Sequence, residues 1–151
     1  MTENIVRRAA LALLVALIAP AVAQAQRVNN DRRGLAVKGY DVVAYFVDGR
    51  AVPGTEAFEH AVGGVRYRFA TAANRDRFAQ DPQRYLPQYG GFCAYAVSKG
   101  YTADTDPQAW KIVGGRLFLN YDRDVQKIWE QDIPGRIAKA DANWPGLSQR
   151  R

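Results

Sequence analysis

Two Gly-Gly pairs, Gly63-Gly64 and Gly114-Gly115, constrain the fold of this chain more than any other feature. Each pair lies between two short segments that are rich in apolar residues. A two-residue glycine loop tolerates the positive φ angles that a tight hairpin turn requires. The sequence therefore predicts two β-hairpins, with strands at residues 57–62 and 65–69 and at residues 110–113 and 116–120.

A two-residue loop also fixes which residues of the two strands face one another. The predicted pairs are His60–Tyr67, Phe58–Phe69 and Glu59–Arg68 in the first hairpin, and Trp110–Leu119 and Ile112–Leu117 in the second. In the first hairpin, His60 is expected to project toward the apolar face, whereas the charged pair projects toward water.

Helix signals lie around both hairpins. Asp41 is suited to cap a short helix before the first hairpin, and Thr71 and Asp122 are suited to cap helices that follow the two hairpins. A last helix is predicted to begin at Pro134 and to end before Asn143.

The two hairpins and the helices after them have similar spacing. Gly63 lies 19 residues before Pro82, and Gly114 lies 20 residues before Pro134. This spacing favours a pseudo-repeat of a hairpin-plus-helix unit, with chance similarity of common turn signals as the alternative. The predicted fold class is α+β, a small single domain of β-hairpins packed with short helices.

The N-terminal segment has the pattern of a secretory signal peptide: Arg7-Arg8, an apolar run over residues 9–19, and Ala23-Gln24-Ala25. The apolar run is too short for a stable membrane span, so we expect cleavage after Ala25 and a periplasmic or secreted protein. An uncleaved anchor is the alternative, and the general secretory and twin-arginine routes both stay open. The predicted division is a signal peptide at 1–25, a disordered leader at 26–35, one domain at 36–147 and a basic tail at 148–151.

Charge and composition exclude several classes of function. The formal net charge is +6, but many of the arginines lie near the two ends of the mature chain, where we expect them to be solvated. No recognition helix or basic, aromatic-rich strand stands out, so nucleic acid is not a predicted partner. The single cysteine, Cys93, excludes an internal disulfide, and with one histidine, His60, it excludes a four-ligand cysteine and histidine zinc site within one chain.

Cys93 is the best candidate for chemistry in this sequence. It follows Gly90-Gly91, and a helix beginning just after these glycines would place the sulfur in its first turn, where backbone N–H groups favour thiolate. A buried, inert thiol is the alternative. Tyr89, Gly90, Gly91 and Tyr67 are predicted to line a small binding pocket near Cys93.

Several segments of this sequence resemble segments of a known protein family. Residues 38–46 (KGYDVVAYF) and 64–69 (GVRYRF), with the Asn74-Arg75, Phe78, Asp81-Pro82 and Tyr85 positions, resemble the YHS-domain family. Residues 87–94 and 140–145 resemble its exported bacterial branch, the YHS domain-containing (seleno)proteins. The resemblance implies a metal-binding module, but the two family cysteines correspond here to Ala70 and Ala73. Cys93 resembles the redox-active position that the selenoprotein name suggests.

Three functions follow as hypotheses. In the first, Cys93 binds a soft metal ion such as copper or zinc, with His60 as a second ligand, and two chains in a homodimer complete the site. In the second, Cys93 is the catalytic group of a thiol redox protein that reacts with an external partner. In the third, the chain is a non-catalytic interaction module in which Cys93 only packs.

Overall fold

The structure is a computed structural model that describes residues 26–150, so the predicted signal peptide lies outside the described residues. The fold is α+β, as predicted, and consists of two antiparallel hairpins with short helices between and around them. In chain order the elements are η1 (Val37–Gly39), α1 (Ala44–Val47), β1 (Thr55–Val62), β2 (Val65–Phe69), α2 (Ala72–Gln80), α3 (Pro82–Tyr85), η2 (Gln88–Gly91), α4 (Ala94–Ser98), β3 (Asp106–Val113), β4 (Arg116–Asn120), α5 (Arg123–Glu130) and α6 (Ile133–Leu147).

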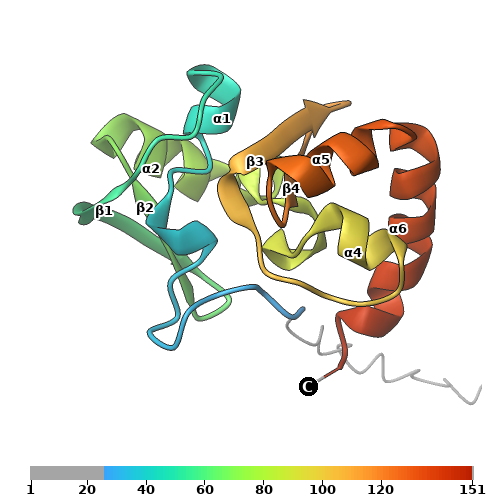
Figure 1. Cartoon of the computed structure of the whole chain (residues 1–151). Helices are drawn as coiled ribbons and strands as arrows, with labels where there is room; N and C mark the ends of the chain where they lie inside the picture. The colour runs from blue at the N-terminus through green and yellow to red at the C-terminus, as the bar shows by residue number, and fades with distance from the viewer. Residues whose placement is uncertain (1–25, 151) are drawn as a thin grey trace, which may run out of the picture.

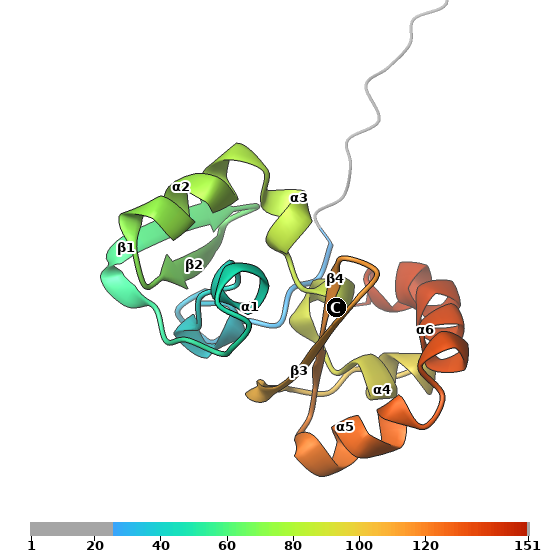
Figure 2. The ribbon, with the colours of Figure 1, turned by 90° about the horizontal axis from the view of Figure 1, so that it is seen from above.

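These elements form two halves that lie side by side (Figures 1 and 2). The first half, residues 36–85, contains α1, the β1–β2 hairpin, α2 and α3. The second half, residues 88–147, contains η2, α4, the β3–β4 hairpin, α5 and α6. The β3–β4 hairpin lies between the first half and the helices of the second (Figure 2).

The two halves repeat one structural unit. β1, β2, α2 and α3 each begin 51 residues before β3, β4, α5 and α6, as in 106 − 55 for the two first strands. The helix caps also repeat, because the Thr71 hydroxyl accepts the Asn74 N–H at 3.1 Å and the Asp122 carboxylate accepts the Val125 N–H at 2.8 Å. The pseudo-repeat that the glycine spacing suggested is therefore present in the fold.

The strand register confirms four of the five predicted pairs. The pairing of Phe58 with Phe69 is wrong, because Thr55 pairs with Phe69 and the strand bulges between Thr55 and Glu59. Gly54, immediately before this strand, lies so close to the Arg68 backbone that a side chain would have no room. The second hairpin has the same irregularity between Asp106 and Trp110.

Each half has its own aromatic core. In the first, Tyr67 of β2 packs on Phe78 of α2, with ring centroids 5.1 Å apart; in the second, Phe118 of β4 packs on Trp129 of α5 at 5.4 Å. The hairpin β3–β4 serves both cores, because Leu117 and Leu119 join the first core while Phe118, between them, joins the second.

The expected disordered leader at residues 26–35 is instead held by backbone hydrogen bonds. The Arg27 N–H donates to the Ser148 carbonyl at 3.2 Å, and the Asn29 N–H donates to the Gly90 carbonyl at 2.8 Å. Leu35 then forms a parallel bridge with Arg66. These contacts join the segment to both halves, so residues 26–35 are an ordered strap, and Ser148, predicted as tail, is a buried part of the fold.

The last helix is longer than predicted, since α6 continues through Pro145 to Leu147. Tertiary contacts outweigh the tendency of the residues before a proline to leave the helical conformation. The Asn143 side chain donates to the Val97 carbonyl at 2.9 Å, and the Trp144 ring packs against Tyr89. The end of α6 is thereby fixed to α4 and η2.

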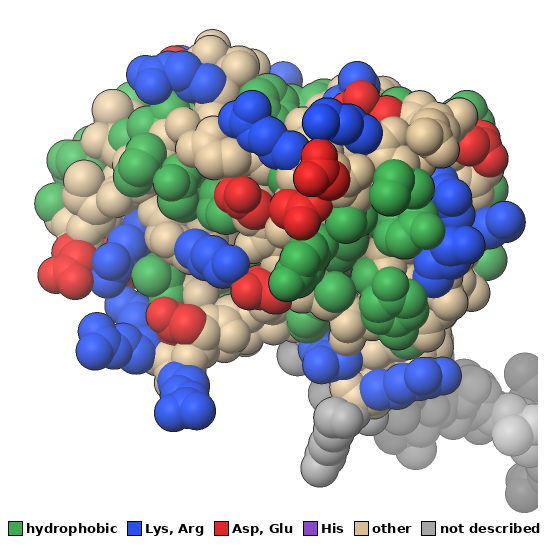
Figure 3. Space-filling model, in the orientation of Figure 1, with side chains coloured by type: hydrophobic (Ala, Val, Ile, Leu, Met, Phe, Trp, Pro, Cys, Tyr) green, Lys and Arg blue, Asp and Glu red, His purple; other side chains and the backbone are tan. Residues whose placement is uncertain are grey.

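The described part of the chain has no helix that is both long enough and apolar enough to cross a membrane. Lys and Arg side chains are spread over the face in Figure 3 and interspersed with Asp and Glu, rather than gathered in one patch. The absence of a nucleic-acid partner stays a prediction.

Candidate functional site

Cys93 lies immediately before α4 and is sealed inside the second half, with only 1% of its surface exposed. Its sulfur accepts the Tyr121 N–H at 3.3 Å, and the thiol lies 3.7 Å from the Asn120 side-chain oxygen. The Cys93 N–H donates to the Ala103 carbonyl at 3.0 Å. The position at the start of α4 agrees with the prediction, but the sulfur does not face solvent.

The expectation that this position favours thiolate is wrong. Burial raises the pKa of the Cys93 thiol, and it outweighs the backbone N–H groups of Ala96 and Tyr121, which act in the opposite direction. A thiol is the less reactive form of cysteine, both as a nucleophile and as a metal ligand. Cys93 therefore has the properties of a structural cysteine.

His60 lies in the other half of the molecule. It is half-buried on β1, with its ring 5.9 Å from the ring of Phe78 in the first core. The sulfur of Cys93 instead contacts residues at the end of β4. Within residues 26–150 no group of three or more His, Cys, Asp and Glu side chains is placed to hold a metal ion. The donor set within one described chain therefore does not fit a closed copper or zinc site.

The repeat explains why a polar atom occupies the position of Cys93. Asp41 lies two residues after Gly39 and three residues before the first residue of α1, whereas Cys93 lies two residues after Gly91 and immediately before α4. The Asp41 carboxylate is fully buried and accepts N–H bonds from Val43, Ala44 and Ala70, at 2.9, 3.1 and 2.9 Å, and from the Asn74 amide at 2.8 Å. Ala70 follows β2 directly, as Tyr121 follows β4.

Asp41 and Cys93 share one task in the two halves, because each accepts the N–H group that follows the second hairpin strand. They differ at the start of the short helix, where Asp41 accepts the Ala44 N–H but the Tyr95 N–H of α4 donates to the Asn120 side chain. The sequence indicated that Asp41 would cap a helix, but not that Cys93 would be its counterpart.

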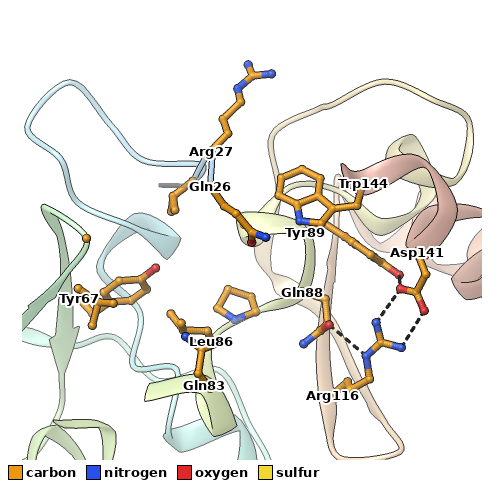
Figure 4. A pocket seen from close by; sticks show the side chains of 15 residues that line it. Gln26, Arg27, Tyr67, Gln83, Leu86, Gln88, Tyr89, Arg116, Asp141 and Trp144 are labelled. Carbon is orange, nitrogen blue, oxygen red and sulfur yellow. Dashed lines mark hydrogen bonds and ion pairs between the residues drawn. The ribbon is translucent and has the colours of Figure 1, made fainter. Parts of the chain in front are cut away.

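A cleft of about 550 Å³ lies between the two halves (Figure 4). Three of the four residues predicted to bind a ligand line it, namely Tyr67, Tyr89 and Gly90. Gly91, the fourth, is not among the lining residues, and its carbonyl accepts the Thr105 hydroxyl at 3.0 Å. Neither Cys93 nor His60 is among the lining residues. The cleft that Tyr67 and Tyr89 line is therefore a different site from the one that contains the Cys93 thiol.

A network of polar groups forms the wall of the cleft that the second half contributes (Figure 4). Arg116 donates to both oxygens of Asp141, at 2.7 and 3.2 Å, and to the Gln88 side-chain oxygen at 3.0 Å. The Tyr89 hydroxyl donates to Asp141 at 2.9 Å. The hydrogen bond from Arg116 has the largest effect on the pKa of Asp141. Together with the one from Tyr89, it holds this pKa below its usual value. Both charges of this wall are therefore already paired.

Tyr67 lies on the opposite wall, and its hydroxyl points toward the cleft (Figure 4). Burial raises the pKa of Tyr67 to about 12, so the phenol is neutral near pH 7. No hydrogen bond within residues 26–150 engages this hydroxyl, which leaves both a donor and an acceptor for a ligand.

The remaining charged side chain of the lining, Arg27, is directed away from the cleft (Figure 4). Its guanidinium lies 4.9 Å from the centre of the Phe92 ring and donates to the Thr102 hydroxyl at 3.3 Å. Glutamine side chains and the Trp144 indole complete the polar and aromatic lining. Nothing in the sequence linked Arg116 to Asp141 or Trp144, because they come together only where the start of β4 meets α6 within the second half.

Comparison with family models, with curated proteins and with solved structures finds no match to this chain. Assignment to the YHS-domain family therefore stays a prediction that rests on the quoted sequence motifs.

Proposed function

We propose that this chain is an exported, YHS-like, non-catalytic binding module, and that it holds a small neutral ligand in the cleft between its two halves. In this proposal Cys93 is a structural capping residue of the second half. The observation that carries the proposal is the cleft itself, which combines an unused phenol hydroxyl at Tyr67 with a paired Arg116–Asp141 wall.

Charge supports a neutral ligand. Every charged side chain that lines the cleft already has a polar partner or is directed away, so a charged ligand would find no free countercharge there. Bringing an unpaired charge into a partly enclosed site costs more free energy than bringing in a neutral polar group. The available groups are instead hydrogen-bonding ones, the Tyr67 hydroxyl and the amides of Gln83 and Gln88.

Burial supports a structural role for Cys93. A catalytic or redox thiol must contact its substrate or its partner protein. The Cys93 sulfur is instead buried and accepts a hydrogen bond from the Tyr121 backbone N–H. The counterpart position in the first half holds a carboxylate that only accepts hydrogen bonds from the protein. The fold therefore accounts for a hydrogen-bond acceptor at position 93 without a catalytic role.

The proposal can be tested by mapping where neutral probes bind. We would titrate uniformly ¹⁵N-labelled protein with simple sugars, N-acetylated amino acid amides and short uncharged peptides, and follow the backbone and indole N–H resonances. The expected result is that shifts gather at residues of the cleft, including the Trp144 indole. Tyr67→Phe should weaken the binding of the best probe about tenfold, since it removes one hydrogen bond.

Cys93→Ser is the matched control and should leave that affinity unchanged. The proposal fails if the shifts gather around Cys93 and Tyr121, or if Cys93→Ser abolishes binding while Tyr67→Phe does not.

Copper or zinc binding by Cys93 and His60 across a homodimer stays a prediction of the sequence. Titration of the reduced protein with either metal, with Cys93→Ser as the control, tests it independently of the cleft.

A further inference from the structure

Gln26 lies at the rim of the cleft, where the chain first enters the described region (Figure 4). Its side chain is exposed, and the chain immediately after it is fixed. The Arg27 N–H donates to the Ser148 carbonyl, and the Arg27 carbonyl lies so close to Gly90 that a side chain there would collide with it. A chain that began at residue 26 would therefore have its first residue held beside the cleft.

The sequence indicates that residue 26 becomes the first residue. Ala23-Gln24-Ala25 has the small-residue spacing of a signal peptidase site, and cleavage after Ala25 would leave a free α-amino group on Gln26. An α-amino group has a pKa of about 7.7 to 8.0, so a useful fraction is uncharged and nucleophilic near neutral pH. Glutamine is the residue whose side-chain carbonyl lies at the right distance to close a five-membered ring on that nitrogen.

We propose that Gln26 is a modification site and that it cyclises to pyroglutamate in the exported protein. The α-nitrogen attacks the side-chain amide carbon Cδ, a new N–C bond forms, the bond from Cδ to the amide nitrogen breaks, and one ammonia leaves with the proton that the α-nitrogen gives up. The step needs no oxidant or cofactor, and the covalent link between the two groups supplies the proximity that favours reaction.

Cyclisation changes the chemistry of the cleft in one direction. An open N-terminus would place a positive charge at a rim where the other charges are paired or directed away. The lactam is neutral and retains one N–H donor and one carbonyl acceptor. The modification therefore suits the neutral ligand proposed above, and this inference rests on the proposed export of the chain.

The test uses the full chain, secreted to the periplasm of a Gram-negative host and purified without an N-terminal tag. We expect an intact mass equal to residues 26–151 less one ammonia, and an N-terminus blocked to Edman sequencing. Treatment with pyroglutamyl aminopeptidase should release the block and expose Arg27. Gln26→Ala, the matched control, should be cleaved at the same bond but remain open and show no loss of ammonia.

The outcomes separate this inference from the proposed function. A chain of residues 26–151 at full mass, with Gln26 readable by Edman sequencing, would overturn the modification and leave export intact. A chain that retains residues 1–25 would overturn both the modification of Gln26 and the proposed export of the chain.

Discussion

The two halves of this molecule use one unit in two different environments. The outer face of the first hairpin presents Arg66 and Arg68, which bond to Glu59 at 3.2 and 2.9 Å. The corresponding positions of the second hairpin, 51 residues later, are Leu117 and Leu119, and both are buried in the first core. The second hairpin is thus covered on both faces. Arginine at these positions thus gives the first hairpin a charged outer face, whereas leucine gives the second hairpin the wall on which the first half packs.

The capping positions differ in a second way. Asp41 satisfies four donors with two oxygens, whereas Cys93 presents one sulfur, and the Asn120 side-chain nitrogen near it is buried without a partner in the described chain. The first half therefore depends on its cap more than the second does. Mutations at paired positions test this comparison.

The largest effect is expected at Asp41. Asp41→Ala should lower the free energy of unfolding by about 3 to 5 kcal/mol, because it leaves several buried N–H groups without an acceptor. Cys93→Ala should cost only about 1 to 2 kcal/mol, since it removes one weak acceptor and a small volume. Urea unfolding followed by circular dichroism measures both values. The exposed Asp48→Ala is the control, and equal losses at Asp41 and Cys93 would end the claim of unequal caps.

The second-largest difference in stability is expected between substitutions on the outer faces of the two hairpins. Leu119→Ala should cost about 2 to 4 kcal/mol, because it opens a cavity in the first core. At the equivalent position Arg68→Ala should cost less than about 1 kcal/mol, since its ion pairs are partly exposed to water. Thermal unfolding of the two variants provides the comparison, and a larger loss for Arg68→Ala would contradict the assignment of the buried wall.

Gly39 and Gly90, which lie 51 residues apart and precede the two caps, should differ by a smaller amount in the cost of an alanine substitution. Gly39 and Gly90 both have positive φ angles, so alanine costs about 1 to 2 kcal/mol at either position. Gly90→Ala carries an additional cost because its methyl group would collide with the Arg27 carbonyl, whereas Gly39→Ala meets only the side chains of Leu35 at 3.4 Å and Arg68 at 3.6 Å. Hydrogen exchange should show loss of protection at Asn29 in Gly90→Ala alone. Retained protection would mean that the strap does not depend on Gly90.

The smallest effect concerns the Arg116–Asp141 pair, which the first half lacks. The pKa of Asp141 is lowered in the folded state, so its contribution is present above the unfolded pKa of about 3.9 and is lost as pH falls through the lower folded value. Asp141→Asn should therefore cost about 0.5 kcal/mol at pH 7, since both groups are partly exposed, and almost nothing near pH 2. A cost that stays constant over this range would show that charge is not the cause.

Much of the fold was predictable because residues close together in the sequence determine the hairpin turns and the helix caps. The glycine loops fixed the register near Val62 and Val65, and Thr71 and Asp122 cap their helices as expected. Predictions failed where a distant segment decided the outcome, as for the bulge after Thr55, for the continuation of α6 through Pro145 and for the strap over Gly90.

The candidate site was less predictable, because it is built from residues that are far apart in sequence. Tyr67 and Tyr89 were predicted to line a pocket near Cys93, and they instead line a cleft that does not include Cys93. Arg116 and Asp141 pair across 25 residues, and the motif at residues 140–145 that contains Asp141 does not indicate Arg116 as its partner. The burial of Cys93 was the decisive fact, and it depends on the packing of α4 and the end of β4, which a lone cysteine in a sequence does not reveal.

Reactivity of the Cys93 thiol tests most directly whether this residue is a structural cap. The measurement is the rate of alkylation by iodoacetamide at pH 8, for the native protein and for the same chain unfolded in urea. Our account predicts that the native thiol reacts at least about 100-fold more slowly, because reaction must wait for local opening of the second half. A native rate equal to or faster than that of the unfolded chain would contradict it and return Cys93 to the role of a reactive centre.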